Sequence, residues 1–173
     1  MIPVFNPFLE QDDELAISQA LKKGYLGMGS FVSDFEQCLT NKLSLDDSSS
    51  LVTCSTGHAG LHLILMALDV KQGDEIITPS FNNVADFQAI QACGATPVFC
   101  DIIPETLCIN PFSIEPLITP NTKAIIALDY GAQLCDHRAL HEISISSGIP
   151  VIHDAAHSFG SKYEGIDIGK QHQ

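Results

Sequence analysis

The chain has 173 residues, of which 45% are hydrophobic, a composition typical of one well-buried globular domain. Its 21 acidic residues outnumber 8 basic ones, and the net charge of −13 argues against nucleic acid and against a membrane surface as partners. The first residues lack a secretory signal pattern, and the six cysteines form no C-x-x-C pair. We therefore expect a cytoplasmic protein with free thiols.

Apolar periodicity and turn residues predict alternating helices and strands along most of the chain. In chain order we expect a helix over 12–23, a helix capped by Ser30, a polar loop over 46–50, a strand over 51–54, a helix over 61–68, a strand over 75–78, a helix over 83–93, a strand over 97–101, a short helix over 111–118, a strand over 124–128, a helix over 136–147 and a strand over 150–153. The connections are long enough for parallel crossovers. This pattern predicts a three-layer α/β/α fold around a mostly parallel sheet.

Side chains that can bind or react follow the expected strands at their carboxyl ends. They are Thr56, Gly57 and His58, then Asn82 and Asn83, then Asp129, Tyr130 and Gly131, and finally Asp154 and His157. Parallel strands place these ends at one edge of a sheet, so we expect a shared cleft. The loop over 56–60 suits an anion, because a helix start offers free N–H groups, although it also fits a plain strand-to-helix turn.

Asp154 carries the strongest functional signal because it ends a buried apolar run. A carboxylate there is unfavourable unless a cation meets it, and one use is to keep a pyridoxal ring nitrogen protonated. A helix N-cap or a structural hydrogen bond explains Asp154 as well. A metal hydrolase using His153, Asp154 and His157 is a further alternative, although a strand sends His153 and Asp154 to opposite faces. His58 and His62 raise the same metal question.

Four segments, in this order, resemble the DegT family of sugar-nucleotide aminotransferases, which are fold-type I enzymes that depend on pyridoxal 5'-phosphate (PLP). The segments are GYLGMGSFV at 24–32, LDVKQGDEIITPSF at 68–81, GATPVFCDI at 94–102 and DAAHSFG at 154–160. The resemblance covers essentially the whole chain. It implies that residues 1–173 are the N-terminal part of a PLP-binding large domain, truncated and without the C-terminal small domain.

The resemblance implies roles for five positions. Asp154 would pair with the pyridinium nitrogen of PLP, and His157 would hydrogen-bond its phenolic oxygen. Gly57 and His58 would offer backbone N–H groups to the phosphate, and Asn83 falls where the family stacks a residue on the ring. Two of these positions depart from the family pattern, since His58 replaces a small hydroxyl residue and Asn83 replaces an aromatic one.

The Schiff-base lysine of the family has no counterpart in this sequence, because none of its lysines lies in the matching context. The family reaction moves an amino group from an amino acid, with glutamate as the expected donor, to a nucleotide-linked keto sugar. Without the lysine we expect this chain to be inactive alone. The alternative is a non-catalytic fragment that binds a partner chain, and the resemblance implies a homodimer.

Overall fold

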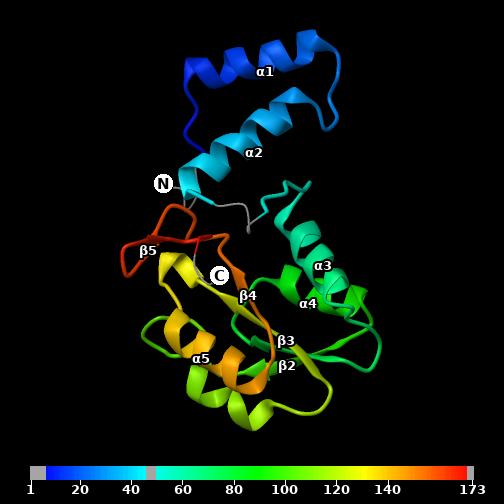
Figure 1. Ribbon diagram of the computed structural model, residues 1–173, viewed down its shortest axis with the longest axis vertical. Coiled ribbons are helices and arrows are strands. Elements are labelled where there is room, and N and C mark those ends of the chain that lie inside the picture. The colour runs from blue at the N-terminus through cyan, green and yellow to red at the C-terminus, as the bar shows by residue number, and fades with distance from the viewer. Residues whose placement is uncertain (1–6, 46–49, 171–173) are drawn as a thin grey trace, which may run out of the picture. The chain divides into compact units, whose positions relative to one another are not determined.

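The computed structural model describes residues 7–45 and 50–170 of the chain. The chain divides into two compact units, Met1–Thr53 and Cys54–Gln173. The elements, labelled in Figure 1, are α1 (Gln11–Lys23), α2 (Ser30–Leu43), α3 (Gly57–Ala67), β1 (Glu75–Pro79), α4 (Val84–Ala92), β2 (Thr96–Cys100), η1 (Pro111–Ser113), η2 (Glu115–Leu117), β3 (Thr122–Leu128), η3 (Tyr130–Ala132), α5 (His137–Ser147), β4 (Val151–Asp154), β5 (Lys162–Tyr163) and β6 (Ile166–Asp167).

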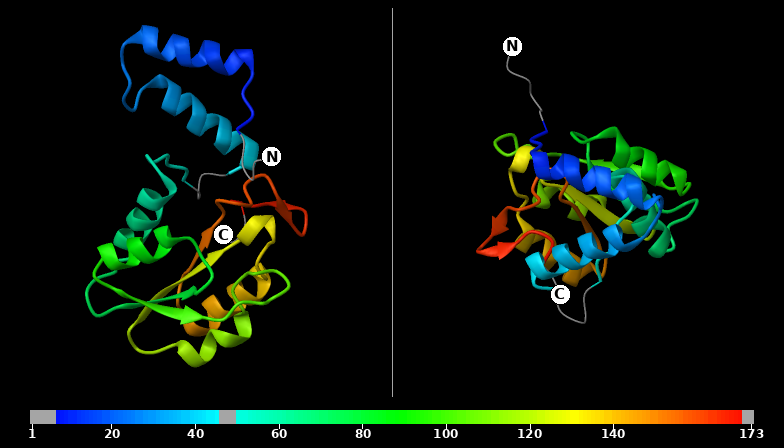
Figure 2. Two further views of the ribbon diagram at one scale, coloured as in Figure 1. Left: turned by 180° about the vertical axis from the view of Figure 1, so that it is seen from behind. Right: turned by 90° about the horizontal axis from the view of Figure 1, so that it is seen from above.

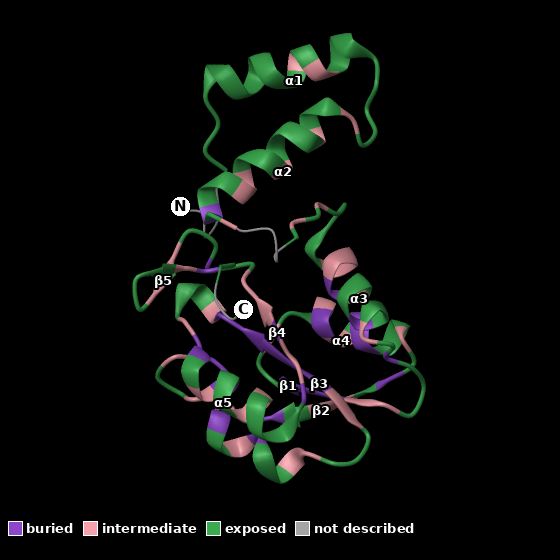
Figure 3. Cartoon of the chain, in the orientation of Figure 1, coloured by how far each residue is buried: buried purple, intermediate pink, exposed green. Residues whose placement is uncertain are grey.

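The first unit contains the two predicted N-terminal helices. A capping box starts α1, in which the side chain of Asp13 accepts a hydrogen bond from the backbone N–H of Glu10 at 2.8 Å. α1 ends at Gly24, whose φ of 76° is favourable only for glycine. Ser30 is the first residue of α2 rather than its cap, which is Gly29. Among the described residues of this unit only Leu43 is buried, so both helices are largely exposed (Figure 3).

The strand predicted over 51–54 is wrong. The segment is not part of a sheet, because no strand among the described residues pairs with it. Instead, the backbone N–H and the hydroxyl of Thr53 donate hydrogen bonds to the Glu36 carboxylate, at 2.8 and 2.7 Å. The polar loop predicted over 46–50 lies outside the described residues except for Ser50.

The second unit confirms the three-layer α/β/α prediction. Its sheet has the strand order β2-β1-β3-β4, and all three pairings are parallel. The helices α3 and α4 lie on one face of the sheet and α5 on the other, as two views show (Figures 1 and 2). Successive residues of a strand point to opposite faces. Ile76 and Ile126 therefore join the core beneath α3 and α4, while Ile77 and Ile125 join the core beneath α5.

Two local features differ from the sequence prediction. The short helix expected over 111–118 is a pair of 3-10 turns, η1 and η2, and Pro116 lacks the N–H that a continuous helix needs. The hairpin of β5 and β6 was not predicted, since two-residue strands carry no periodicity. Its turn residues Glu164 and Gly165 both have positive φ, as tight hairpins favour. Within the described ranges, no helix combines the length and apolarity required to cross a bilayer.

Candidate cofactor site

A cavity of about 210 Å³ lies at the carboxyl ends of β3 and β4, beside the starts of α3 and α4. Its lining consists of Gly57, His58, Leu61, Asn83, Ala85, Leu128, Asp154, Ala156 and His157. The structure therefore brings together all five positions to which the sequence assigns a cofactor role. They converge because the register of β3 and β4 aligns Leu128 with Asp154 at one edge of the sheet.

The start of α3 provides the anion-binding feature of this cavity. Thr56 caps the helix, and its side chain accepts a hydrogen bond from the N–H of Ala59 at 3.1 Å. The N–H groups of Gly57 and His58 have no carbonyl partner within the helix and carry the positive end of its dipole. A Cβ at Gly57 would meet no atom within 4 Å, so open space lies directly beside these donors.

The ring of His58 is turned toward α4. Its Nδ1 lies 3.1 Å from the carbonyl oxygen of Ala85. With Nδ1 directed at α4, the group of His58 that the helix start offers to an anion is its backbone N–H. Backbone donors and the helix dipole together suit a phosphate at this position.

Asp154 ends β4 and is half-buried at the wall of the cavity. Its Oδ1 accepts a hydrogen bond from the backbone N–H of Ala156 at 2.9 Å. A structural hydrogen bond was one of the explanations that the sequence allowed for Asp154, and this contact is such a bond. It fixes the orientation of the carboxylate. The same carboxylate still lines the cavity, so its structural and functional interpretations are compatible.

His157 lies on the loop after β4, where its Nδ1 accepts a hydrogen bond from the N–H of Gly131. The edge of its ring faces Tyr130, with 5.6 Å between ring centroids. Tyr130 packs in turn against Phe81, at 4.7 Å. The imidazole is held from two sides, at the same edge of the sheet as Asp154.

Asn83 acts as the N-cap of α4 at the edge of the cavity. Its side-chain oxygen accepts a hydrogen bond from the N–H of Ala85 at 2.9 Å. Its backbone N–H donates to the side-chain oxygen of Asn82 at 2.6 Å. Asn83 is therefore committed to a capping interaction that an aromatic residue at this position would not make.

Asp129, Tyr130 and Gly131 are absent from the cavity lining, although the sequence placed them in the same cleft. Asp129 is buried behind the cavity. Its Oδ1 accepts a hydrogen bond from the N–H of Cys135 at 2.9 Å and lies 3.1 Å from Nε2 of His137. Its Oδ2 accepts from the hydroxyl of Ser158 at 2.7 Å, which ties the loop carrying His157 to the end of β3.

The hydrogen bonds around Asp129 determine its charge state. Burial alone raises the pKa of this carboxyl, but hydrogen bonds from His137, Cys135 and Ser158 outweigh burial and leave the pKa below its ordinary value. Asp129 is therefore a buried, ionised carboxylate whose oxygens are hydrogen-bonded within the fold, and we call it the buried anchor.

Asp86 was missed by the sequence analysis. It lies on α4, is fully buried, and accepts a hydrogen bond on Oδ2 from the side-chain amide of Asn82 at 2.6 Å. Burial is the main factor that raises its pKa to about 7, followed by the charge of Asp154. The available signal was its position in the helix, because Asp86, Ala89 and Ile90 form one buried stripe and a carboxyl in such a stripe requires an explanation.

The metal alternatives receive no support from the geometry. No group of three or more His, Cys, Asp or Glu residues suited to a metal ion occurs in the part of the chain that the structure describes. The ring of His153 stacks on His137 at 4.6 Å, whereas Asp154 lines the cavity. The strand thus separates His153 from Asp154, as its alternation predicted.

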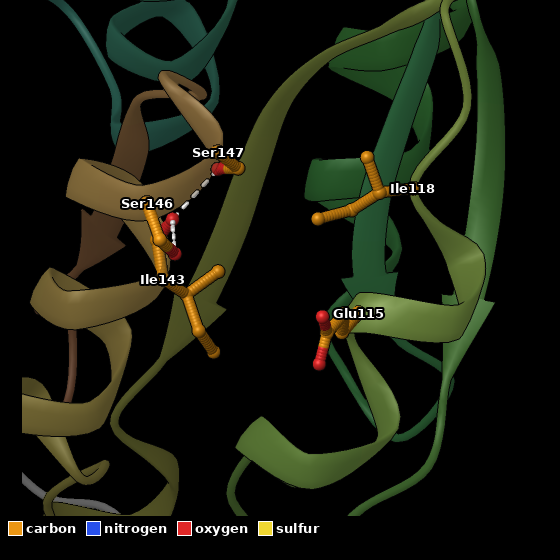
Figure 4. A pocket seen from close by; sticks show the side chains of 5 residues that line it. All are labelled: Glu115, Ile118, Ile143, Ser146 and Ser147. Atoms are coloured by element: carbon orange, nitrogen blue, oxygen red, sulfur yellow. Dashed lines mark hydrogen bonds between the residues drawn. The ribbon is translucent and has the colours of Figure 1, made fainter.

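A second cavity, of about 370 Å³, lies between η2 and α5 (Figure 4). Its lining consists of Glu115, Ile118, Ile143, Ser146 and Ser147. The hydroxyls of Ser146 and Ser147 donate to the carbonyl oxygen of Ile143, at 3.1 and 2.7 Å. These donors are used within α5, and none of the predicted site residues lies here.

A comparison with protein families matches residues 7–173 to the DegT/DnrJ/EryC1/StrS aminotransferase family. Among solved structures, the aminotransferase TlmJ from Streptoalloteichus hindustanus is 34% identical, with a TM-score of 0.91 over 98% of this chain and 46% of that chain. S. venezuelae DesV is 31% identical, with a TM-score of 0.84 over 90% of this chain and 41% of its own.

A third similar structure is the PMP-form of Spr1654 from Streptococcus pneumoniae, described as a putative sugar aminotransferase. It is 27% identical, with a TM-score of 0.90 over 97% of this chain and 46% of that chain. The present chain therefore spans less than half the length of each of these three proteins.

Proposed function

Because this chain belongs to the DegT/DnrJ/EryC1/StrS aminotransferase family, we propose that it forms a PLP-binding site of a sugar-nucleotide aminotransferase. The observation that carries the proposal is the single cavity lined by the start of α3, Asp154 and His157. We further propose that residues 1–173 correspond to the N-terminal part of the large domain of such an enzyme. An amino acid, with glutamate as the expected donor, and a nucleotide-linked keto sugar are the proposed substrates of the whole protein.

The residues present fit PLP in charge and position. The N–H groups of Gly57 and His58 suit its phosphate, since a helix start attracts an anion. The Asp154 carboxylate suits a protonated ring nitrogen, and the Nε2–H of His157 suits a phenolic oxygen. When bound, PLP supplies an electron sink for charge that develops on the amino-acid substrate. The chain contributes the carboxylate that keeps this sink protonated.

None of the residues that line the cavity is a lysine. A covalent attachment of PLP and a proton carrier for transamination both need such an amine beside the cofactor. We therefore propose that this chain binds PLP without a covalent bond and performs no transamination on its own. Turnover of glutamate and a keto-sugar nucleotide by the purified chain with PLP would contradict this part of the proposal.

The decisive experiment is a PLP titration of the purified chain, followed by absorbance and by borohydride reduction with mass analysis. We expect a saturable absorbance change in the wild type and no covalent adduct. Asp154→Asn removes the charge that faces the ring nitrogen and should weaken binding by roughly a hundredfold. Equal affinity in both proteins would exclude the proposed site, and a specific adduct on one lysine would exclude non-covalent binding.

We also propose that the chain associates with a second copy through the first unit. Ile17 and Leu21 lie four residues apart on α1 and are 59% and 60% exposed. Acidic residues occupy the first turn of α1 and Lys22 and Lys23 its last turn. Two antiparallel copies of α1 would bring opposite charges together, which favours a symmetric dimer.

Sedimentation velocity tests this association. We expect a dimer in the wild type and a monomer in the double variant Ile17→Glu, Leu21→Glu, since each change places a charge on the apolar face. A wild type that remains monomeric throughout a concentration series would contradict the proposal. The substitutions lie on an exposed helix, so circular dichroism of the variant should match that of the wild type.

A further inference from the structure

Two carboxyl groups meet beside the proposed cofactor cavity. Asp154 lines the cavity from the end of β4, and Asp86 lies on α4, which packs against α3 and β2. The Asp154 carboxylate raises the pKa of Asp86, first through its charge and then through a side-chain hydrogen bond. Two neighbouring ionised carboxylates repel one another, which favours the protonated form of the more buried one, Asp86.

The surroundings of Asp86 identify which group holds that proton. Asp86 is fully buried, whereas Asp154 is half-buried. The amide of Asn82 occupies Oδ2 of Asp86, and within the described residues its buried Oδ1 has no hydrogen-bond partner of its own. An unpartnered buried carboxylate oxygen is unfavourable, while a carboxylic acid O–H at this position can donate to a neighbouring carboxylate.

The two elements with the most contacts to α4 are α3 and β2, and each carries titratable side chains. α3 carries His58 and His62, and β2 carries Cys100. The pKa of Asp86 responds first to burial, then to the charge of Asp154, and then to hydrogen bonds with Asn82 and Asp154. Asn82 lowers that pKa and the other factors raise it, so burial and Asp154 together retain the proton.

We propose that Asp86 is a positioning residue that donates a hydrogen bond from its carboxyl to Asp154 and so orients the Asp154 carboxylate toward the cofactor ring nitrogen. The inference deepens the proposed function and rests on it for the role of Asp154. The shared proton is a property of the chain without any ligand. It can therefore be tested independently of PLP.

The matched variants are Asp86→Asn and Asp86→Leu. An asparagine can accept from Asn82 through its oxygen and donate to Asp154 through its amide, so it reproduces the protonated state at every pH. A leucine has a similar size but offers no donor. Circular dichroism verifies that each variant folds, and the asparagine variant keeps the test valid if the leucine variant does not fold.

The first measurement is a carbon-13 NMR titration of the aspartate carboxyls in the ligand-free chain. We expect the Asp86 carboxyl to titrate near neutral pH in the wild type and at lower pH in Asp154→Asn, because the neighbouring charge is removed. An Asp86 carboxyl that titrates in the ordinary range, or one that Asp154→Asn does not affect, would overturn the proposal. This result stands even if the chain binds no PLP.

The second measurement uses nitrogen-15-labelled PLP, whose ring-nitrogen shift reports protonation. We expect the shift of a protonated ring in the wild type and in Asp86→Asn, and a loss of protonation or at least tenfold weaker binding in Asp86→Leu. Equal shifts and affinities in the two variants would exclude a role of Asp86 in positioning Asp154. Failure of the wild type to bind PLP would refute the proposed function while the carboxyl titration still decides the shared proton.

Discussion

The backbone N–H of Gly131 donates a hydrogen bond to Nδ1 of His157, with 3.1 Å between the two nitrogens. A neutral imidazole that accepts at Nδ1 carries its proton on Nε2. The loop after β3 therefore selects the tautomer of a side chain on the loop after β4. The selected tautomer presents a hydrogen-bond donor at the cavity edge.

Substitution of His157 tests this donor. His157→Phe keeps a planar ring but removes the Nε2–H, and we expect PLP affinity to fall by about tenfold or more, because a hydrogen bond to a charged oxygen is lost. His157→Asn retains an N–H group and should lose less. Fluorescence titration with PLP measures both, and an unchanged affinity of the phenylalanine variant would contradict the proposed role of His157.

The buried anchor at Asp129 should control both stability and the geometry of the cavity. Ser158→Ala removes one of its hydrogen bonds, and we expect a loss of about 1 kcal/mol in the free energy of unfolding. Asp129→Asn removes the charge at the centre of the cluster and should cost about 3 kcal/mol. Urea unfolding measures both values, and an Asp129→Asn loss no larger than that of Ser158→Ala would show that the charge is unimportant.

The pKa of Asp129 also predicts how the fold responds to acid. The folded pKa lies below the ordinary value of 3.8, so Asp129 contributes stability that is present above that pH. The contribution is lost as the pH falls through the folded pKa. Urea midpoints measured down an acid series should therefore fall more steeply in the wild type than in Asp129→Asn.

The sheet could be predicted because its strands are short apolar runs between turn residues. Strands that are buried on both faces are predicted by the adjacent isoleucines Ile76 and Ile77 and by Ile125 and Ile126. The parallel order of these strands follows from the helices between them. The same argument failed at 51–54. A strand exists only when a neighbour pairs with it, and an apolar run does not reveal whether that neighbour is present.

The positions of the candidate site residues could be predicted in part, because some of them follow directly from the predicted strands. Asp154 and His157 follow a strand, so the topology that places strand ends also places them. Asp86 was not identified because its partners, Asn82 and Asp154, come from the loop before α4 and from the end of a strand far along the chain. Periodicity finds the buried stripe of a helix but not the polar group that meets a side chain in it.

The raised pKa of Asp86 predicts a second pH effect, opposite in sign to that of Asp129. The folded carboxyl keeps its proton up to about pH 7, whereas an unfolded one releases it near 3.8. The contribution of Asp86 to stability is therefore greatest at low pH and falls as the pH rises from 3.8 through about 7. At about 1.4 kcal/mol per pH unit the whole effect is at most about 4 kcal/mol.

Urea unfolding of the wild type and of Asp86→Asn, at a series of pH values from weakly acidic to weakly basic, checks this effect. The asparagine variant cannot lose the proton, so its stability should be nearly flat over the range in which that of the wild type declines. Parallel curves for the two proteins would mean that Asp86 titrates normally in the folded chain.

The cysteine thiols test whether burial or ionisation determines how fast a thiol reacts in the folded chain. Cys38 and Cys54 are exposed, whereas Cys100, Cys108 and Cys135 are buried. A hydrogen bond from Cys135 is the main factor that lowers the pKa of Cys108 to about 6, which by itself favours the reactive thiolate. Access should nevertheless decide the rate, because Cys108 is only 1% exposed.

We therefore expect a thiol reagent such as DTNB to modify Cys38 and Cys54 rapidly in the native chain, and Cys108 only as the fold opens. Mass analysis of the modified peptides at successive times distinguishes the sites, and denaturant supplies the reference in which all six cysteines react. Addition of denaturant below the unfolding midpoint should accelerate Cys108 in proportion to the open population. Modification of Cys108 as fast as that of Cys38 would show that the core beneath α5 admits the reagent without unfolding.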